Sequence, residues 1–312
     1  MAMPNWKFLA VLLTIALALL LASPLRAFQS AEALRDQNII RREVNRVNVV
    51  VTAVDKKGKF VTDLTQTDFK VFEDGKPQVI TNFSKQTDLP LNIALVIDTS
   101  SSVTVKLPFE RDAAVDFIHN VMRENDKALL VEFDTGVTLL QDLTSKPNEI
   151  SRQIGKLRAG GGTSLYDALC LVASQKLKNL QGRKVIVLLS DGADIDSKAT
   201  LEETLEKLRE SDASVYAIST SGYGVGGEVQ GDKALRRLAE ETGGRIYFPY
   251  SASQMTQHFS SINQELRSQY NLAYESQNPM KNGGYRSIRV KVDRDNVQLR
   301  HRKGYVAQIP RS

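Results

Sequence analysis

The segment LVIDTSSSV, residues 95–103, places one carboxylate and four hydroxyl groups directly after a run of apolar residues. Such a cluster can be an ordinary polar turn or a helix cap, because Asp, Ser and Thr side chains often accept hydrogen bonds from the first amides of a helix. It can also be half of a cation site made of oxygen ligands. A cation would require further oxygen ligands from other parts of the chain.

Two further polar groups occur in equivalent places. Thr163 lies in GGGTS at the expected start of a helix, and Asp191 ends the apolar run KVIVLLSD. Each alone is typical of a cap or a turn. In doubly wound sheets, however, ligands bind at the carboxyl ends of the strands, where the strand order reverses. Carboxylate and hydroxyl oxygens suit Mg²⁺ or Ca²⁺ better than zinc or copper.

Strand-like and helix-like segments alternate from Leu91 onward. Five runs have the length of buried strands: NIALVID (92–98), ALLVEFD (128–134), KVIVLLSD (184–191), SVYAIST (214–220) and RIYFPY (245–250). A sixth run, VTLLQDL (137–143), is expected to form a hairpin with 128–134. Helices are expected up to about 123, over 149–157, from 164, and over 200–211, 232–242 and 252–268. This order predicts an α/β fold with a doubly wound, mostly parallel sheet that helices cover on both faces.

The segments on either side of this region have the period-two alternation of β-strands. Tight turns such as Glu73-Asp74-Gly75-Lys76 separate the strands of the first segment. We therefore expect residues 46–86 and 268–308 to pair into one small β-sandwich, with an α/β domain over 90–267 inserted between them.

The N-terminal residues have the layout of a secretory signal peptide. Lys7 gives a positive start, Phe8 to Ala22 is apolar, and a small-residue region allows cleavage after Ala27. Residues 1–27 are thus the expected signal peptide and 28–45 a linker. The alternative is an uncleaved membrane anchor, since the apolar run approaches a spanning length. Either way the remainder is expected to be periplasmic, extracellular or at the cell surface.

Charge and cysteine content exclude several classes of protein. The net charge is +5, and removal of Lys7 and Arg26 with the signal peptide lowers it to +3, too little to indicate a nucleic-acid partner. Cys170 is the only cysteine, which excludes an intrachain disulfide and a lipoprotein anchor after the apolar run. The three histidines are scattered and have no zinc-site spacing.

The combined motif resembles a known family. Asp98-x-Ser100-x-Ser102, Thr163 in GGTSLYDAL and Asp191 in LLSDG are similar to the metal-ion-dependent adhesion site of the von Willebrand factor type A (VWA) domain. This resemblance covers residues 90–265. The flanking segments resemble those of the VWFA-related exported proteins of Acidobacteria.

The resemblance implies a role for each of the five residues. Ser100, Ser102 and Thr163 would offer hydroxyl oxygens to the ion, and Asp98 and Asp191 would balance its charge directly or through water. The implied ion is Mg²⁺, with Mn²⁺ or Ca²⁺ as alternatives. One coordination position would stay open for an Asp or Glu of a partner protein.

Four other acidic residues lie near the motif in the sequence. Asp167 is expected in the first turn of a helix, where it favours the helix dipole. Asp194 and Asp196 are expected either to line the rim of the site or to solvate their loop. Asp134 is expected at the same edge of the sheet, but not as a ligand.

The function indicated is metal-dependent protein binding without catalysis. One alternative is a metal-assisted hydrolase, which would need a general base or nucleophile beside the ion. No histidine lies in a motif loop and no Ser/His/Asp arrangement is evident. A second alternative is a structural or assembly scaffold in which the ion only stabilises the fold.

Overall fold

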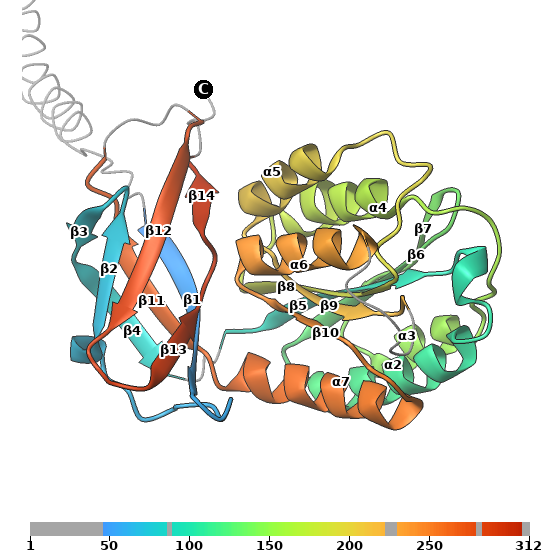
Figure 1. Ribbon diagram of the computed structural model, residues 1–312, viewed down its shortest axis with the longest axis horizontal. Helices are drawn as coiled ribbons and strands as arrows, with labels where there is room; N and C mark the ends of the chain where they lie inside the picture. Colours follow the sequence, from blue (N-terminus) through green and yellow to red (C-terminus); the bar gives the residue numbers. More distant parts are fainter. Residues whose placement is uncertain (1–45, 86–88, 222–229, 279–282, 308–312) are drawn as a thin grey trace, which may run out of the picture. The chain divides into compact units, whose positions relative to one another are not determined.

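The computed structural model describes residues 46–85, 89–221, 230–278 and 283–307 (Figure 1). The expected signal peptide and linker, residues 1–45, lie outside the described residues. Within the described ranges, no helix combines the length and the apolar character that crossing a membrane would require.

A six-stranded sheet forms the centre of the α/β domain. Its strands are β5 (Leu91–Asp98), β6 (Lys127–Phe133), β7 (Val137–Thr144), β8 (Arg183–Ser190), β9 (Ser214–Ser219) and β10 (Arg245–Tyr247). They lie in the order β10-β9-β8-β5-β6-β7, and only β7 runs antiparallel to its neighbour, as the expected hairpin with β6. The chain moves from β5 to one side of the sheet and returns through β8 to the other. The strand order therefore reverses between β5 and β8.

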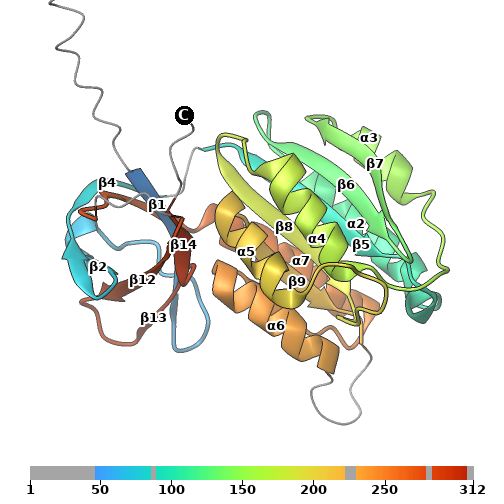
Figure 2. The ribbon, with the colours of Figure 1, turned by 90° about the horizontal axis from the view of Figure 1, so that it is seen from above.

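Helices cover both faces of this sheet (Figures 1 and 2). One face carries α2 (Leu107–Val121), α3 (Pro147–Ile154) and α7 (Ala252–Arg267), and the other carries α4 (Leu165–Leu171), α5 (Leu201–Ser211) and α6 (Gln230–Thr242). Short helical segments η2 (Ser101–Val103) and η3 (Val172–Leu177) precede α2 and follow α4, and η3 is π-helical.

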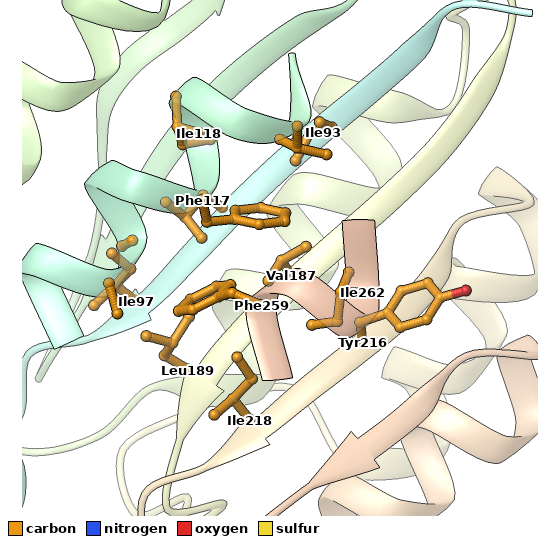
Figure 3. Packing of buried hydrophobic residues seen from close by; sticks show 14 of the residues in the cluster. Ile93, Ile97, Phe117, Ile118, Val187, Leu189, Tyr216, Ile218, Phe259 and Ile262 are labelled. Atoms are coloured by element: carbon orange, nitrogen blue, oxygen red, sulfur yellow. The ribbon is translucent and has the colours of Figure 1, made fainter. Parts of the chain in front are cut away.

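Every residue of β5 is buried, because its side chains alternate between two apolar cores. Ile93 and Ile97 point to the α2 and α7 side, and Ala94 and Val96 to the other. Figure 3 shows the first core, where Phe117 of α2 stacks on Phe259 of α7 with ring centroids 4.8 Å apart. Burial on both faces explains the continuous apolar runs in the sequence.

The N- and C-terminal strands form two four-stranded antiparallel sheets. The first, ordered β13-β1-β11-β4, contains β1 (Arg46–Asp55), β4 (Ile80–Lys85), β11 (Tyr270–Glu275) and β13 (Val297–Arg300). The second, ordered β14-β12-β2-β3, contains β2 (Phe69–Glu73), β3 (Lys76–Gln78), β12 (Tyr285–Val292) and β14 (Gly304–Val306). A 3₁₀ turn, η1 (Gln66–Asp68), leads into β2. Each sheet mixes strands from both ends of the chain, and their inner faces share one apolar core. The predicted fold class is confirmed.

A buried carboxylate joins α7 to strands of both regions, which belong to one compact unit from Arg46 onward. Glu265 is fully buried, and its Oε1 accepts hydrogen bonds from Thr52 of β1 at 3.0 Å and from the Tyr216 hydroxyl of β9 at 2.8 Å. The guanidinium of Arg300, in β13, lies 2.5 Å from the same oxygen. Glu265 thus links the C-terminal end of α7 to strands β1, β9 and β13.

Candidate functional site

Two aspartates lie at the point where the strand order reverses. Asp98 is the last residue of β5, and Asp191 follows the last residue of β8 directly. The two strands are parallel neighbours, with Ile97 opposite Leu189 in the register. Both carboxylates are therefore at the carboxyl edge of the sheet, where doubly wound folds bind ligands.

Hydrogen bonds connect four of the five predicted ligand residues. The Ser100 amide donates to Asp98 Oδ1 at 2.9 Å, and the hydroxyl oxygens of Ser100 and Ser102 lie 2.9 Å apart. The Ser102 hydroxyl then donates to Asp191 Oδ2 at 2.8 Å. The structure thus brings these side chains together from the ends of two strands, and Ser102 and Asp191 are 89 residues apart in the sequence.

The loop that carries Thr163 lies against the same segment. Gly160 donates its amide hydrogen to the Thr99 carbonyl at 2.8 Å, and the Ser101 hydroxyl donates to the Gly161 carbonyl at 2.9 Å. Thr163 itself is only 4% exposed. The fifth predicted ligand residue therefore lies on a loop that is hydrogen-bonded to the other motif segment.

Asp196 fixes the position of Thr163. Its Oδ2 accepts the Thr163 amide hydrogen at 2.8 Å, while the Thr163 carbonyl accepts from the amides of Ile195 and Asp196 at 3.0 Å each. A Cβ on Gly162 would come 1.8 Å from the same Asp196 oxygen, so a larger residue there would displace this carboxylate from the Thr163 amide. Asp196 holds the backbone beside the site, a role that the sequence interpretation of rim or solvation did not include.

Two other acidic residues act in a similar way. Asp167 accepts the amide hydrogens of Lys198 and Ala199, and Asp194 Oδ1 accepts that of Tyr166 at 3.1 Å. These bonds tie the loop after β8 to the start of α4. Their donors are backbone groups about 30 residues away, so no sequence pattern could predict these bonds.

Asp134 lies at the expected edge, where its carbonyl accepts from the Ser164 amide at 2.7 Å. Its carboxylate accepts from the Gly136 amide at 2.9 Å and so closes the β6–β7 turn.

Ser190 also contacts the site, although the sequence analysis did not identify it. Its buried hydroxyl donates to Asp98 Oδ2 at 2.8 Å, which leaves both oxygens of this carboxylate with a protein donor.

Comparison with known proteins agrees with this architecture. The model of the von Willebrand factor type A domain matches residues 92–265, more than half of the chain. The chain belongs to this family. A human protein, von Willebrand factor A domain-containing protein 3B, is 25% identical over 161 residues, which make up 50% of this chain and 12% of that protein.

Solved structures show the same fold at low sequence identity. A von Willebrand factor type A structure from Catenulispora acidiphila is 14% identical, has a TM-score of 0.51, and the match covers 77% of this chain and 74% of that one. Proximal thread matrix protein 1 of the mussel byssus is 18% identical with a TM-score of 0.51, over 62% and 51% of the two chains. VWA domains generally mediate protein–protein interactions.

The side chains of the VWA site fit a hard divalent cation. Among the described residues, no three His, Cys, Asp or Glu side chains form a group that could hold a metal ion by themselves. The cluster instead combines two carboxylates with hydroxyl groups, which are ligands typical of Mg²⁺. Burial raises the pKa of the Asp98 carboxyl, the hydrogen bonds from Ser100 and Ser190 oppose this, and the Asp191 charge adds to the increase. A bound cation would relieve this cost.

A third carboxyl group lies behind the site. Glu110 of α2 is fully buried, and neither of its oxygens has a hydrogen-bond partner among the described residues. Burial raises the pKa of Glu110 to about 8, and the Asp98 and Asp191 charges act in the same direction while Lys106 opposes them. Glu110 is therefore protonated at neutral pH when no cation is present.

Replacing Glu110 with glutamine is expected to change how stability depends on pH. Its pKa rises from an ordinary 4.5 to about 8 on folding, so its protonated form stabilises the native state below about pH 4.5, and this contribution is lost as the pH rises to 8. As the pH rises across this range, the free energy of unfolding of Glu110→Gln should increase relative to that of wild type by up to about 1.4 kcal/mol per pH unit. Urea unfolding of both proteins in EDTA from acid to pH 8 measures the difference. Parallel pH profiles would contradict this prediction.

Proposed function

We propose that this protein is an exported, non-catalytic binding module whose VWA domain holds Mg²⁺ and binds an acidic side chain of a partner protein. The observation that carries the proposal is the hydrogen-bonded chain from Asp98 through Ser100 and Ser102 to Asp191. These hydrogen-bonded side chains lie where the strand order reverses, and the loop bearing Thr163 is hydrogen-bonded to the same segment.

Each residue has a distinct task in this proposal. Asp98 and Asp191 supply the negative charge. They lie at the ends of two neighbouring buried strands, so the sheet itself holds them close together. Ser100, Ser102 and Thr163 supply neutral oxygens, which leave the bound cation with net positive charge. Mn²⁺ or Ca²⁺ could take the place of Mg²⁺, since all three prefer oxygen ligands.

The partner is proposed to be a protein that presents an Asp or Glu. When bound, Mg²⁺ would offer an open coordination position to this carboxylate. Such a bond is strong in a partly desolvated cleft, because an ionised group interacts there with a concentrated positive charge. Asp98, Ser100 and Thr163 are buried whereas Ser102 is exposed, so the motif is partly withdrawn from water.

The positions of the histidines favour binding over hydrolysis. His119 of α2 contacts Ser151, His258 of α7 lies beside Tyr247, and His301 accepts the Val290 amide hydrogen in the sandwich. All three histidines thus make contacts away from the loops of the site.

Export is proposed from the signal-like residues 1–27 alone. The proposed location of the exported protein is the periplasm, the extracellular space or the cell surface.

A small carboxylate should reach the bound cation if a position is open. Mn²⁺ can replace Mg²⁺ as a paramagnetic ion. The methyl protons of acetate should then relax faster with protein-bound Mn²⁺ than with the same concentration of bound Mn²⁺ whose open position a competing ligand occupies. Thr163→Val should lose the effect because it lacks the hydroxyl. Asp142→Asn, at a surface pair with Lys176, is the matched control that should keep it.

The same measurement distinguishes a binding site from a structural ion. If Mn²⁺ binds but acetate relaxation stays at the free value, the coordination is closed, and the scaffold role replaces the proposed one.

A further inference from the structure

Exposed apolar side chains gather on the two segments that carry the proposed cation ligands. Among the residues that the structure describes, seven large hydrophobic side chains are exposed: Val79, Leu89, Val105, Phe109, Ile195, Tyr250 and Tyr285. Three of them lie close to the site in the chain. Val105 is 82% exposed, Phe109 52% and Ile195 77%.

Val105 and Phe109 lie on one side of the site. Val105 comes three residues after Ser102, and the chain turns there into α2 through hydrogen bonds from Lys106 to the Val103 carbonyl and from Phe109 to the Lys106 carbonyl. Val105 lies in the turn before the N-cap Lys106, and Phe109 lies in the first turn of α2. Both exposed side chains therefore follow the motif serines within seven residues of Ser102.

Ile195 lies on the other side. Its amide donates to the Thr163 carbonyl at 3.0 Å, so it is next to the fifth proposed ligand residue. The loop bearing Ile195 starts at Asp191, which the Ser102 hydroxyl reaches at 2.8 Å. Two exposed apolar residues thus follow the motif serines and one adjoins Thr163 and Asp191, and we call Val105, Phe109 and Ile195 the apolar rim.

The apolar rim sets a requirement on any partner. A carboxylate that reaches the ion brings its neighbouring residues within contact distance of the rim. Polar neighbours would gain little from covering Val105 and Ile195, whereas apolar neighbours would remove both surfaces from water. Single exposed hydrophobic residues are normal on a protein surface, but a group around one polar site marks an interaction surface.

We propose that the partner segment carries its Asp or Glu between apolar residues, which pack on Val105, Phe109 and Ile195. This proposal rests on the proposed function, because the acidic residue needs the cation. The rim adds the specificity that a cation and a carboxylate alone lack, since any exposed Asp or Glu could otherwise compete. The occupant is a protein segment of acidic-apolar sequence.

The test is a selection from a random dodecapeptide library displayed on phage. The full chain is immobilised, the library is bound in Mg²⁺ and eluted with EDTA, and the recovered sequences are compared with the input. A double variant, Val105→Ser with Ile195→Ser, is selected in parallel. Val79→Ser is the matched control, since Val79 is 70% exposed but belongs to the sandwich region.

Wild type and Val79→Ser should enrich an acidic residue with apolar residues within two positions of it. The double variant should enrich the acidic residue alone. A synthetic peptide of the selected sequence should bind wild type about tenfold or more tightly than the double variant, as expected for burial of one or more apolar side chains.

Three outcomes would overturn the inference. If wild type selected acidic peptides without apolar neighbours, the apolar rim would have no role in binding, and the proposed function would be unaffected. Apolar peptides that EDTA does not release would show that the rim binds without the cation. Recovery of no acidic sequence in the EDTA eluate would contradict the proposed function and the rim together.

Discussion

Replacing Glu265 with alanine should lower the free energy of unfolding by about 3–5 kcal/mol, the cost typical of removing one partner from a buried ion pair. Glu265 is fully buried, and Thr52, Tyr216 and Arg300 all direct polar groups at its Oε1. The variant leaves the Arg300 charge and two hydroxyl groups without this acceptor. Burial of these groups without partners is the larger part of the expected cost.

Urea unfolding followed by circular dichroism measures this loss. Glu240→Ala is the matched control, because Glu240 lies on α6, is well exposed and faces Arg236 at 3.9 Å. Exposed pairs of this kind contribute about 0–1 kcal/mol. If Glu265→Ala lost no more stability than the control, the buried contact would not hold α7 to the strands as described.

Asp98→Asn should reduce Mg²⁺ affinity by at least about 100-fold, since even residues that only orient a metal ligand contribute about 10–100-fold. Asparagine keeps the shape of the side chain and can still accept the Ser100 amide hydrogen through Oδ1. It removes a charge whose burial is unfavourable in the absence of a cation, as the raised pKa of Asp98 indicates. The metal-free variant should therefore be at least as stable as wild type.

Thermal unfolding with and without Mg²⁺ separates these two effects. Wild type should gain stability with the logarithm of the Mg²⁺ concentration, as any ligand that binds only the native state requires. Asp98→Asn should show no gain, and Asp142→Asn should behave as wild type. A variant that kept the full Mg²⁺ effect would exclude Asp98 from the site.

The order of elements could be predicted from the sequence because burial on both faces leaves a plain signal. Runs such as NIALVID and KVIVLLSD are continuous and apolar, whereas the strands of the sandwich alternate. Alternation shows which side chains share a face but not which strand is the neighbour. The pairing of β1 with β11 and of β2 with β12 therefore came from the structure.

The candidate site could be predicted only in part. Asp98, Ser100, Ser102, Thr163 and Asp191 follow from residue type and position at the ends of elements, and their role as ligands stays a prediction. The residues that support them could not be found in this way. Ser190 looks like any strand residue, Asp196 like a loop acid, and Glu110 like an exposed position on a helix. Ser190 and Asp196 bond to residues that are distant in the sequence, and the burial of Glu110 arises only after folding.

Calorimetric titration of Mg²⁺ into the metal-free chain is the decisive experiment for the proposed cation site. We expect saturable binding of one ion per chain, loss of that binding in Asp98→Ala and Thr163→Ala, and native circular dichroism spectra for both variants. Absence of binding to the wild-type chain would contradict this expectation. The segment Asp98 to Ser102 would then be a turn and a cap within an intact VWA fold, and the partner surface would have to be sought on the β-sandwich.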